Sequence, residues 1–141
     1  MSVALVSPRG PGGILAFAVE QRAVADRAEV NVLVAAADFA DMHGFVGGSP
    51  FGGRGHGTEQ MVRLGGGGTP EVAEFAAAEF GAELKMSTYA AEQLMGAALD
   101  LQHRLPMTWT AVQMLLTKAW IGVKIAKMTR HLPRSARSTE R

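Results

Sequence analysis

Cysteine is absent from this chain of 141 residues, and asparagine occurs only once, at Asn31. Without cysteine there is no disulfide, no thiolate zinc site and no cysteine nucleophile. The four histidines are His43, His56, His103 and His131, which fall on separate predicted elements and do not supply three or four convergent ligands. We therefore predict no metal, no cofactor and no catalytic residue, and a protein that is not an enzyme.

Long apolar runs are also lacking. The most apolar stretch, 106–126, is interrupted by Lys118 and Lys124, so it does not predict a membrane span. The apolar run 12–19 soon meets Glu20, which indicates the start of a helix and not a signal peptide. These features predict a soluble cytoplasmic protein with no membrane partner.

Charge is unevenly distributed along the chain. Residues 1–100 carry six basic and twelve acidic side chains, a net −6, whereas residues 101–141 carry eight basic side chains and one acid, a net +7. A basic end on an acidic chain is typical of a surface that meets a polyanion. The alternative is a solvated helix face followed by a disordered tail.

Glycine content and helical periodicity divide the chain into four segments and predict an all-α fold. Residues 1–44 hold a long helix over 14–43, and residues 45–68 form a Gly-rich linker within which Glu59–Leu64 is a candidate extended segment. Residues 69–132 form a compact region of four helices, and residues 133–141 form a disordered basic tail.

The first helix has a predicted length of about 45 Å, at 1.5 Å per residue. That is longer than the remaining helices are wide when packed together. The helix therefore either bends or offers surplus apolar surface to a partner, and a homodimer formed through this helix is one prediction.

Helix-start residues define the first two helices of the four-helix region. Thr69 as N-cap and Pro70 at the first helical position predict a helix that runs to about Leu84. Ser87 is expected to cap the second helix, which ends at Leu105 before a proline.

Apolar spacing predicts the buried faces and the two remaining helices, over 108–116 and 118–131. On the second helix we expect a buried stripe and, opposite it, exposed Glu92, Gly96 and His103. The stripe consists of Ala91, Leu94, Ala98, Leu101 and Leu105. The last helix is expected to bury Ile121, Ile125, Met128 and Leu132 and to turn Lys124, Lys127 and His131 outward.

The junction of the first two helices, Phe80–Leu94, resembles a helix-turn-helix. Gly81 or Ala82 permits close crossing, and polar side chains that could reach bases or phosphates begin the second helix. Lys85 occupies the turn position where a positive φ favours glycine. Many helical hairpins share this pattern without touching DNA, so a plain packing unit is the alternative.

The candidate nucleic-acid-binding residues follow from these two features. The basic end contributes Lys118, Lys124, Lys127 and Arg130, and the start of the second helix contributes Ser87, Thr88 and Gln93. For Asp100 and His103, three residues apart, the spacing suggests a surface ion pair.

Three segments resemble the helical region that precedes the nuclease domain in the actinobacterial HNH-endonuclease-associated family. They are ADFADMHG (Ala37–Gly44), the run Leu64–Pro106 containing TPEVAEFA and ALDLQHRLP, and the run Trp109–Leu132 ending in MTRHL. The resemblance covers about two-thirds of the chain and implies a bacterial helical domain of unknown function. In such proteins the C-terminal HNH domain cuts DNA with a divalent metal, using a histidine base and an asparagine.

The departures from that family are equally informative. The only asparagine, Asn31, lies in the first helix and cannot supply an HNH centre. Lys85 replaces a glycine, Met107 also departs, and Leu115–Ala119 replaces a Gly-Glu-Val-Pro turn. The family's helical region should continue beyond Pro133, whereas RSARSTER follows here, which predicts truncation or a changed reading frame.

Together these features predict a non-catalytic helical module of an HNH-endonuclease-family protein, with weak DNA binding through its basic C-terminal helix. Two alternatives stay open. One is a self-association or protein-docking module, and the other is a degenerate fragment without activity.

Overall fold

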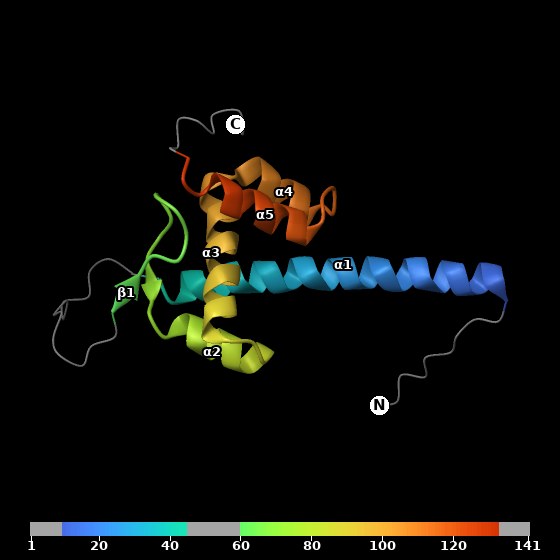
Figure 1. The fold of residues 1–141 in the computed structure, drawn as a ribbon, viewed down its shortest axis with the longest axis horizontal. Coiled ribbons are helices and arrows are strands. Elements are labelled where there is room, and N and C mark those ends of the chain that lie inside the picture. The colour runs from blue at the N-terminus through green and yellow to red at the C-terminus, as the bar shows by residue number, and fades with distance from the viewer. Residues whose placement is uncertain (1–9, 45–59, 133–141) are drawn as a thin grey trace.

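The computed structural model describes residues 10–44 and 60–132 of the chain. These residues form five helices and one two-stranded antiparallel sheet, which confirms the predicted all-α class (Figure 1). In chain order the elements are α1 (Pro11–Met42), β1 (Met61–Val62), β2 (Val72–Ala73), α2 (Ala76–Leu84), α3 (Thr88–Arg104), α4 (Pro106–Gln113) and α5 (Ala119–Thr129). The predicted tail, 133–141, lies outside the described residues.

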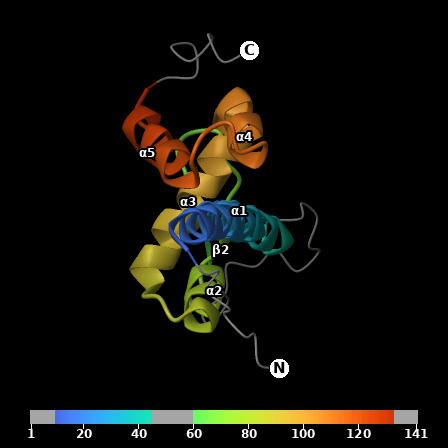
Figure 2. The ribbon, with the colours of Figure 1, turned by 90° about the vertical axis from the view of Figure 1, so that its right-hand side faces the viewer.

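Helix α3 is the centre of the fold and packs against all four other helices. It passes across α1, with α2 on one side of α1 and with α4 and α5 on the other (Figures 1 and 2). Nine of its seventeen residues are buried, so this helix carries a core on several faces at once. The predicted bounds of this helix are confirmed, and the Ser87 side chain accepts a hydrogen bond of 3.0 Å from the Ala90 amide as its N-cap.

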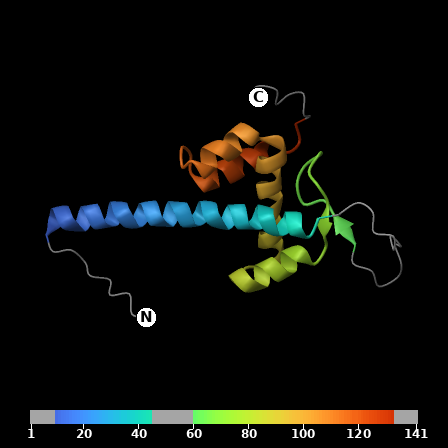
Figure 3. The same ribbon diagram turned by 180° about the vertical axis from the view of Figure 1, so that it is seen from behind.

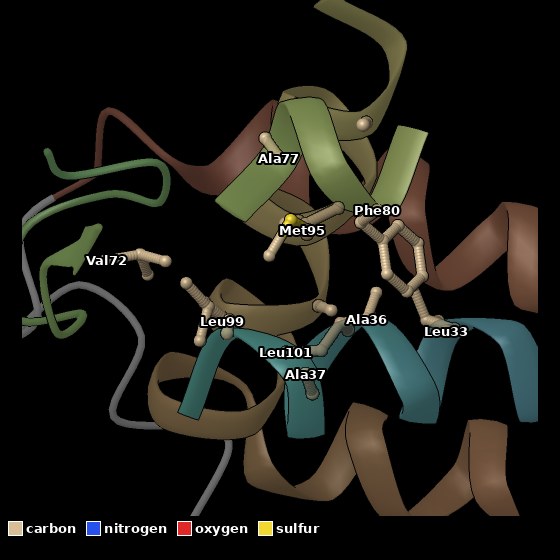
Figure 4. Close-up of a cluster of buried hydrophobic side chains, with 14 of the residues drawn as sticks. Leu33, Ala36, Ala37, Val72, Ala77, Phe80, Met95, Leu99 and Leu101 are labelled. Carbon is tan, nitrogen blue, oxygen red and sulfur yellow. The ribbon is translucent and has the colours of Figure 1, made fainter. Parts of the chain in front are cut away.

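The core is built from side chains of all five helices and from Val72 of β2, and Figure 4 shows the part formed by α1, α2, α3 and Val72. Met95 of α3 lies beside Ala77 of α2, and Leu99 of α3 lies between Val72 and α1 (Figure 4). Phe39 packs on Phe80 with ring centroids 5.6 Å apart and the rings tilted by 42°. Many of the remaining core residues are alanines, which allow the helix axes to approach closely.

The segment before α2 differs from the prediction. Thr69 and Pro70 do not start a helix, because Thr69 is buried and its hydroxyl donates to the carbonyl of Gly66 at 2.7 Å. Val72 and Ala73 instead pair with Met61 and Val62, and α2 begins at Ala76. Residues 60–68 of the predicted linker thus fold against the module, with a short strand in the candidate extended segment, whereas residues 45–59 lie outside the described part.

The buried faces of α3 and α5 also need correction. Gly96 is buried because the backbone of Leu64 packs directly against it, so closely that any side chain there would collide with the Leu64 carbonyl. On α5 the buried residues are Ala119, Gly122 and Ala126. The expected large residues lie to the side of this stripe: Ile121 and Ile125 are half-buried, and Met128 and Leu132 are exposed. Small residues face the module because α5 packs closely on α3 and α4, and at Gly122 the side chain of Val112 of α4 leaves no room for a side chain.

Helix α1 extends far beyond the other helices, as Figures 1 and 3 show. Its buried residues begin only at Val30, whereas Ile14, Leu15, Val19 and Val24 are at least half exposed. The predicted surplus of apolar surface on this helix is therefore present. Within the described residues, no helix is both long enough and apolar enough to cross a membrane.

Candidate functional site

A buried cluster of one carboxylate and two guanidinium groups joins α3 to the end of α5. Asp100 is 1% exposed, and its Oδ2 accepts a hydrogen bond of 2.8 Å from Nε of Arg130. Its Oδ1 lies 3.6 Å from Nη1 of Arg104, one helical turn further along α3. Two cations thus share one buried anion, and the shared carboxylate holds the arrangement together because its removal leaves buried positive charge unpaired.

The glycine run Gly65–Gly68 closes over this cluster. The Gly66 amide donates to Oδ1 of Asp100 at 2.7 Å, and a side chain at Gly66 would occupy the space of the Arg104 guanidinium. Arg104 also donates, through Nη2, to the carbonyls of Arg130 and Leu132, both at 3.0 Å. The guanidinium therefore caps the last turn of α5 while the loop covers it.

This cluster brings together two of the three sequence segments on which the family resemblance rests, Leu64–Pro106 and Trp109–Leu132. Gly66 belongs to the glycine run, Asp100 and Arg104 belong to ALDLQHRLP, and Arg130 belongs to MTRHL. Sequence analysis did not identify the cluster, although Asp100 and Arg104 at positions i and i+4 of a helix were a usable indication of an ion pair. These motif residues stabilise the fold at the point where the glycine run, α3 and the end of α5 meet.

The predicted DNA-contact residues of the basic end are only partly free. Lys124 and Lys127 are exposed on α5. Lys118, however, donates to Oδ2 of Asp26 at 2.8 Å, and Arg130 is committed to Asp100. Two of the four candidate cations therefore already have an anionic partner within the chain.

The helix-turn-helix resemblance holds for the turn but not for the exposure of its second helix. Lys85 ends α2 in the left-handed conformation, with φ of 57° and ψ of 38°, and Gly81 contacts the carbonyl of Met86 closely. A recognition helix must leave most of one face open to enter a groove of DNA. On α3 the exposed residues are Thr88 and Tyr89 of the first turn and His103 of the last, and Gln93 is half-buried.

The two sets of candidate residues lie at opposite ends of α3. Thr88 begins this helix beside α2, whereas Asp100, near its other end, holds the last turn of α5 (Figure 1). Thr88 and Asp100 are twelve positions apart on this helix, which corresponds to about 18 Å. A single short phosphate track therefore does not pass over both sets.

An apolar groove of about 440 Å³ lies where α5 meets α1. Ala28, Val32 and Leu33 of α1 form one wall, and Trp120 and Val123 of α5 form the other. Trp120 is 60% exposed, which is unusual for so large an aromatic side chain. The groove sits at the base of the projecting part of α1.

The other titratable residues do not gather into a site. His103 lies 4.0 Å from Asp41 of α1, so the expected contact between His103 and Asp100 is wrong. His43 bonds the carbonyl of Phe39 at 2.8 Å. Among residues 10–44 and 60–132, no three histidine, aspartate or glutamate side chains converge as metal ligands.

Compared with family models, with curated proteins and with solved structures, the chain gives no match. The resemblance to the HNH-endonuclease-associated family therefore stays a prediction from the residues that carry it.

Proposed function

We propose that this chain is a helical self-association module, in which the projecting part of α1 docks on a second copy. One observation carries the proposal: α1 leaves Ile14, Leu15, Val19 and Val24 exposed over the turns that precede its first buried residue, Val30. Single exposed apolar residues are ordinary, but a helix of several turns with little packing of its own is not.

Helix stability supports this proposal. Helices in proteins gain most of their stability from packing of an apolar face, and the start of α1 contains two glycines, Gly12 and Gly13, that lower its helix propensity. The projecting part gains stability when a partner buries its apolar side chains.

Sedimentation of the full chain over a range of concentrations tests the proposal. We expect a reversible monomer–dimer equilibrium in the micromolar range, since the surface is narrow. A chain that sediments as a monomer up to about 1 mM, where binding free energy falls to about −4 kcal/mol, would overturn the proposed function.

A second candidate function is weak binding of DNA through Lys124 and Lys127. It is favoured by the exposure of both lysines on one helix that lacks acidic side chains. Contacts of this kind are insensitive to sequence and strongly dependent on salt, because they release counterions from the phosphates. Membership of the HNH-endonuclease-associated family and a cytoplasmic location belong to the same proposal.

A further inference from the structure

A continuous exposed stripe runs along α1 from its tip to the groove. Its members are Ile14, Ala18, Gln21, Ala25, Ala28 and Val32, and all six are exposed. They follow one another at alternating steps of four and three residues, which keeps them within about 80° of each other around the helix. This spacing is that of a seam between two helices.

We propose that two copies pair their α1 helices antiparallel along this stripe, so that the tip of each helix lies in the groove of the other copy. The inference rests on the self-association proposed above. It adds which face of α1 pairs, that the two helices run antiparallel, and that the groove holds the tip of the second helix. Because each copy has one projecting helix and one groove, twofold symmetry satisfies both contacts at once and closes the assembly.

The groove makes this face the better partner surface. Ala28 and Val32 belong both to the stripe and to the wall of the groove, so a helix laid along the stripe runs directly into it. The opposite face of α1, which carries Val19, leads instead to Ala23 and Asp26. There the connection between α4 and α5 bounds a smaller and more polar hollow, and Lys118 is paired with Asp26 across it.

The antiparallel register follows from matching the stripe to itself. Ile14 then faces Val32 of the second copy, Ala18 faces Ala28 and Gln21 faces Ala25, and the same three pairs recur on the other side of the twofold axis. Alanines in the middle allow the two helices to approach closely, while the larger side chains at the ends fill the grooves. Gln21, the polar member of the seam, disfavours slipped registers at some cost in stability.

Charge and area are compatible with this pairing. Arg22 and Glu29 lie on the same flank of the stripe, where antiparallel pairing brings each Arg22 beside Arg22 of the second copy, with Glu29 of that copy between one and two turns further along, so the four charges sum to zero. The seam covers about 27 Å of each helix and buries, with the two grooves, on the order of 1,000 Å² in total. That is close to the lower bound for a specific interface and fits a weak dimer.

The natural absence of cysteine makes crosslinking a direct test of direction. We would prepare Ala18→Cys and Ala28→Cys as two separate full-length variants, both at exposed positions, and oxidise each alone and in a mixture. Antiparallel pairing predicts a mixed disulfide between the two variants, at least tenfold more abundant than either self-linked product. Self-linked Ala18→Cys as the main product means parallel pairing and overturns the inference.

Two variants of α1 test the face. Ile14→Glu places a charge in the groove and is expected to weaken dimerisation at least tenfold in sedimentation experiments. Val19→Glu is the matched control, because Val19 is an exposed apolar residue of the same helix, about 140° away from Ile14. It should change the dissociation constant by less than threefold, and the reverse order of effects overturns the inference.

The fluorescence of Trp120, which lines the groove, tests whether the tip of α1 lies in the groove of the second copy. In a Trp109→Phe background Trp120 is the only tryptophan, and its emission should shift to shorter wavelength and resist acrylamide quenching as the dimer forms. A chain that dimerises with no change in Trp120 fluorescence retains the proposed function, but it overturns the placement of the α1 tip in the groove. A chain that does not dimerise at all fails the proposed function itself.

Discussion

Asp100 and Arg130, thirty residues apart in the chain, form an ion pair of 2.8 Å in which the carboxylate is almost wholly buried. The same carboxylate accepts the Gly66 amide and lies beside Arg104. One acidic side chain thus fixes the glycine loop, the middle of the fold and the end of α5. Interference with this one group affects three segments that are distant in sequence.

Replacing Asp100 should therefore be among the most damaging changes in the chain. Asp100→Ala leaves the buried Arg104 without its anion, and we expect a loss of about 3–5 kcal/mol in the free energy of unfolding, measured by urea denaturation. Asp26→Ala serves as control, because it breaks an ion pair with Lys118 that is more exposed than the Asp100–Arg104 pair, and it should cost about 0–1 kcal/mol. Equal losses in the two variants would contradict a special role for the buried cluster.

Gly96 should resist substitution by even the smallest side chain. A methyl group there collides with the backbone carbonyl of Leu64, so Gly96→Ala is expected to lower the free energy of unfolding by about 1–3 kcal/mol. Gly67→Ala is the matched control, because nothing lies within 4 Å of the added methyl group, and its effect should stay within about 0.5 kcal/mol. A neutral Gly96→Ala would mean that the loop moves away freely from α3.

Two turns carry non-glycine residues in the left-handed conformation, Lys85 with φ of 57° and Leu115 with φ of 59°. Glycine avoids the steric cost of this conformation, so Lys85→Gly and Leu115→Gly should each raise the free energy of unfolding by about 0.5–1 kcal/mol. Lys124→Gly, inside α5, should act in the opposite direction by about 1 kcal/mol. Thermal unfolding of the three variants checks the sign, and a destabilising Lys85→Gly would show that the Lys85 side chain is needed.

The basic face of α5 can be tested for DNA binding without disturbing the fold. The double variant Lys124→Ala with Lys127→Ala should weaken binding of duplex DNA and reduce the salt slope by about two, one unit for each lost phosphate contact. Lys118→Ala should alter the slope less, because that lysine is already paired with Asp26. Titrations at several salt concentrations measure both, and a slope unchanged in the double variant would exclude this face.

Reading of bases by the start of α3 is best tested at Thr88. Ser87 caps α3, so Ser87→Ala is expected to lower stability by about 1 kcal/mol whatever its effect on DNA. Thr88→Ala leaves the cap in place and should not change DNA affinity if α2 and α3 form only a packing unit. Loss of affinity for one sequence alone, measured across a set of duplexes, would instead establish base recognition.

Local sequence features determined the helices and several of their ends. The long uninterrupted pattern of α1, the Ser87 cap and the proline after Leu105 act within a few residues, so the sequence is sufficient to predict them. The exposure of Lys124 and Lys127 was predictable for the same reason, since it depends on helical periodicity alone.

Tertiary structure decided what those helices do with their faces. Thr69 and Pro70 have the local features of a helix start, yet the buried hydroxyl of Thr69 and the pairing of β2 with β1 outweigh them. Arg130 looked like a free cation until the fold placed Asp100 beside it. Helix α5 turned alanine and glycine inward because close packing against Val112 of α4 has no room for a larger side chain. Such outcomes depend on which distant residues come into contact, and periodicity within one helix carries no information about that.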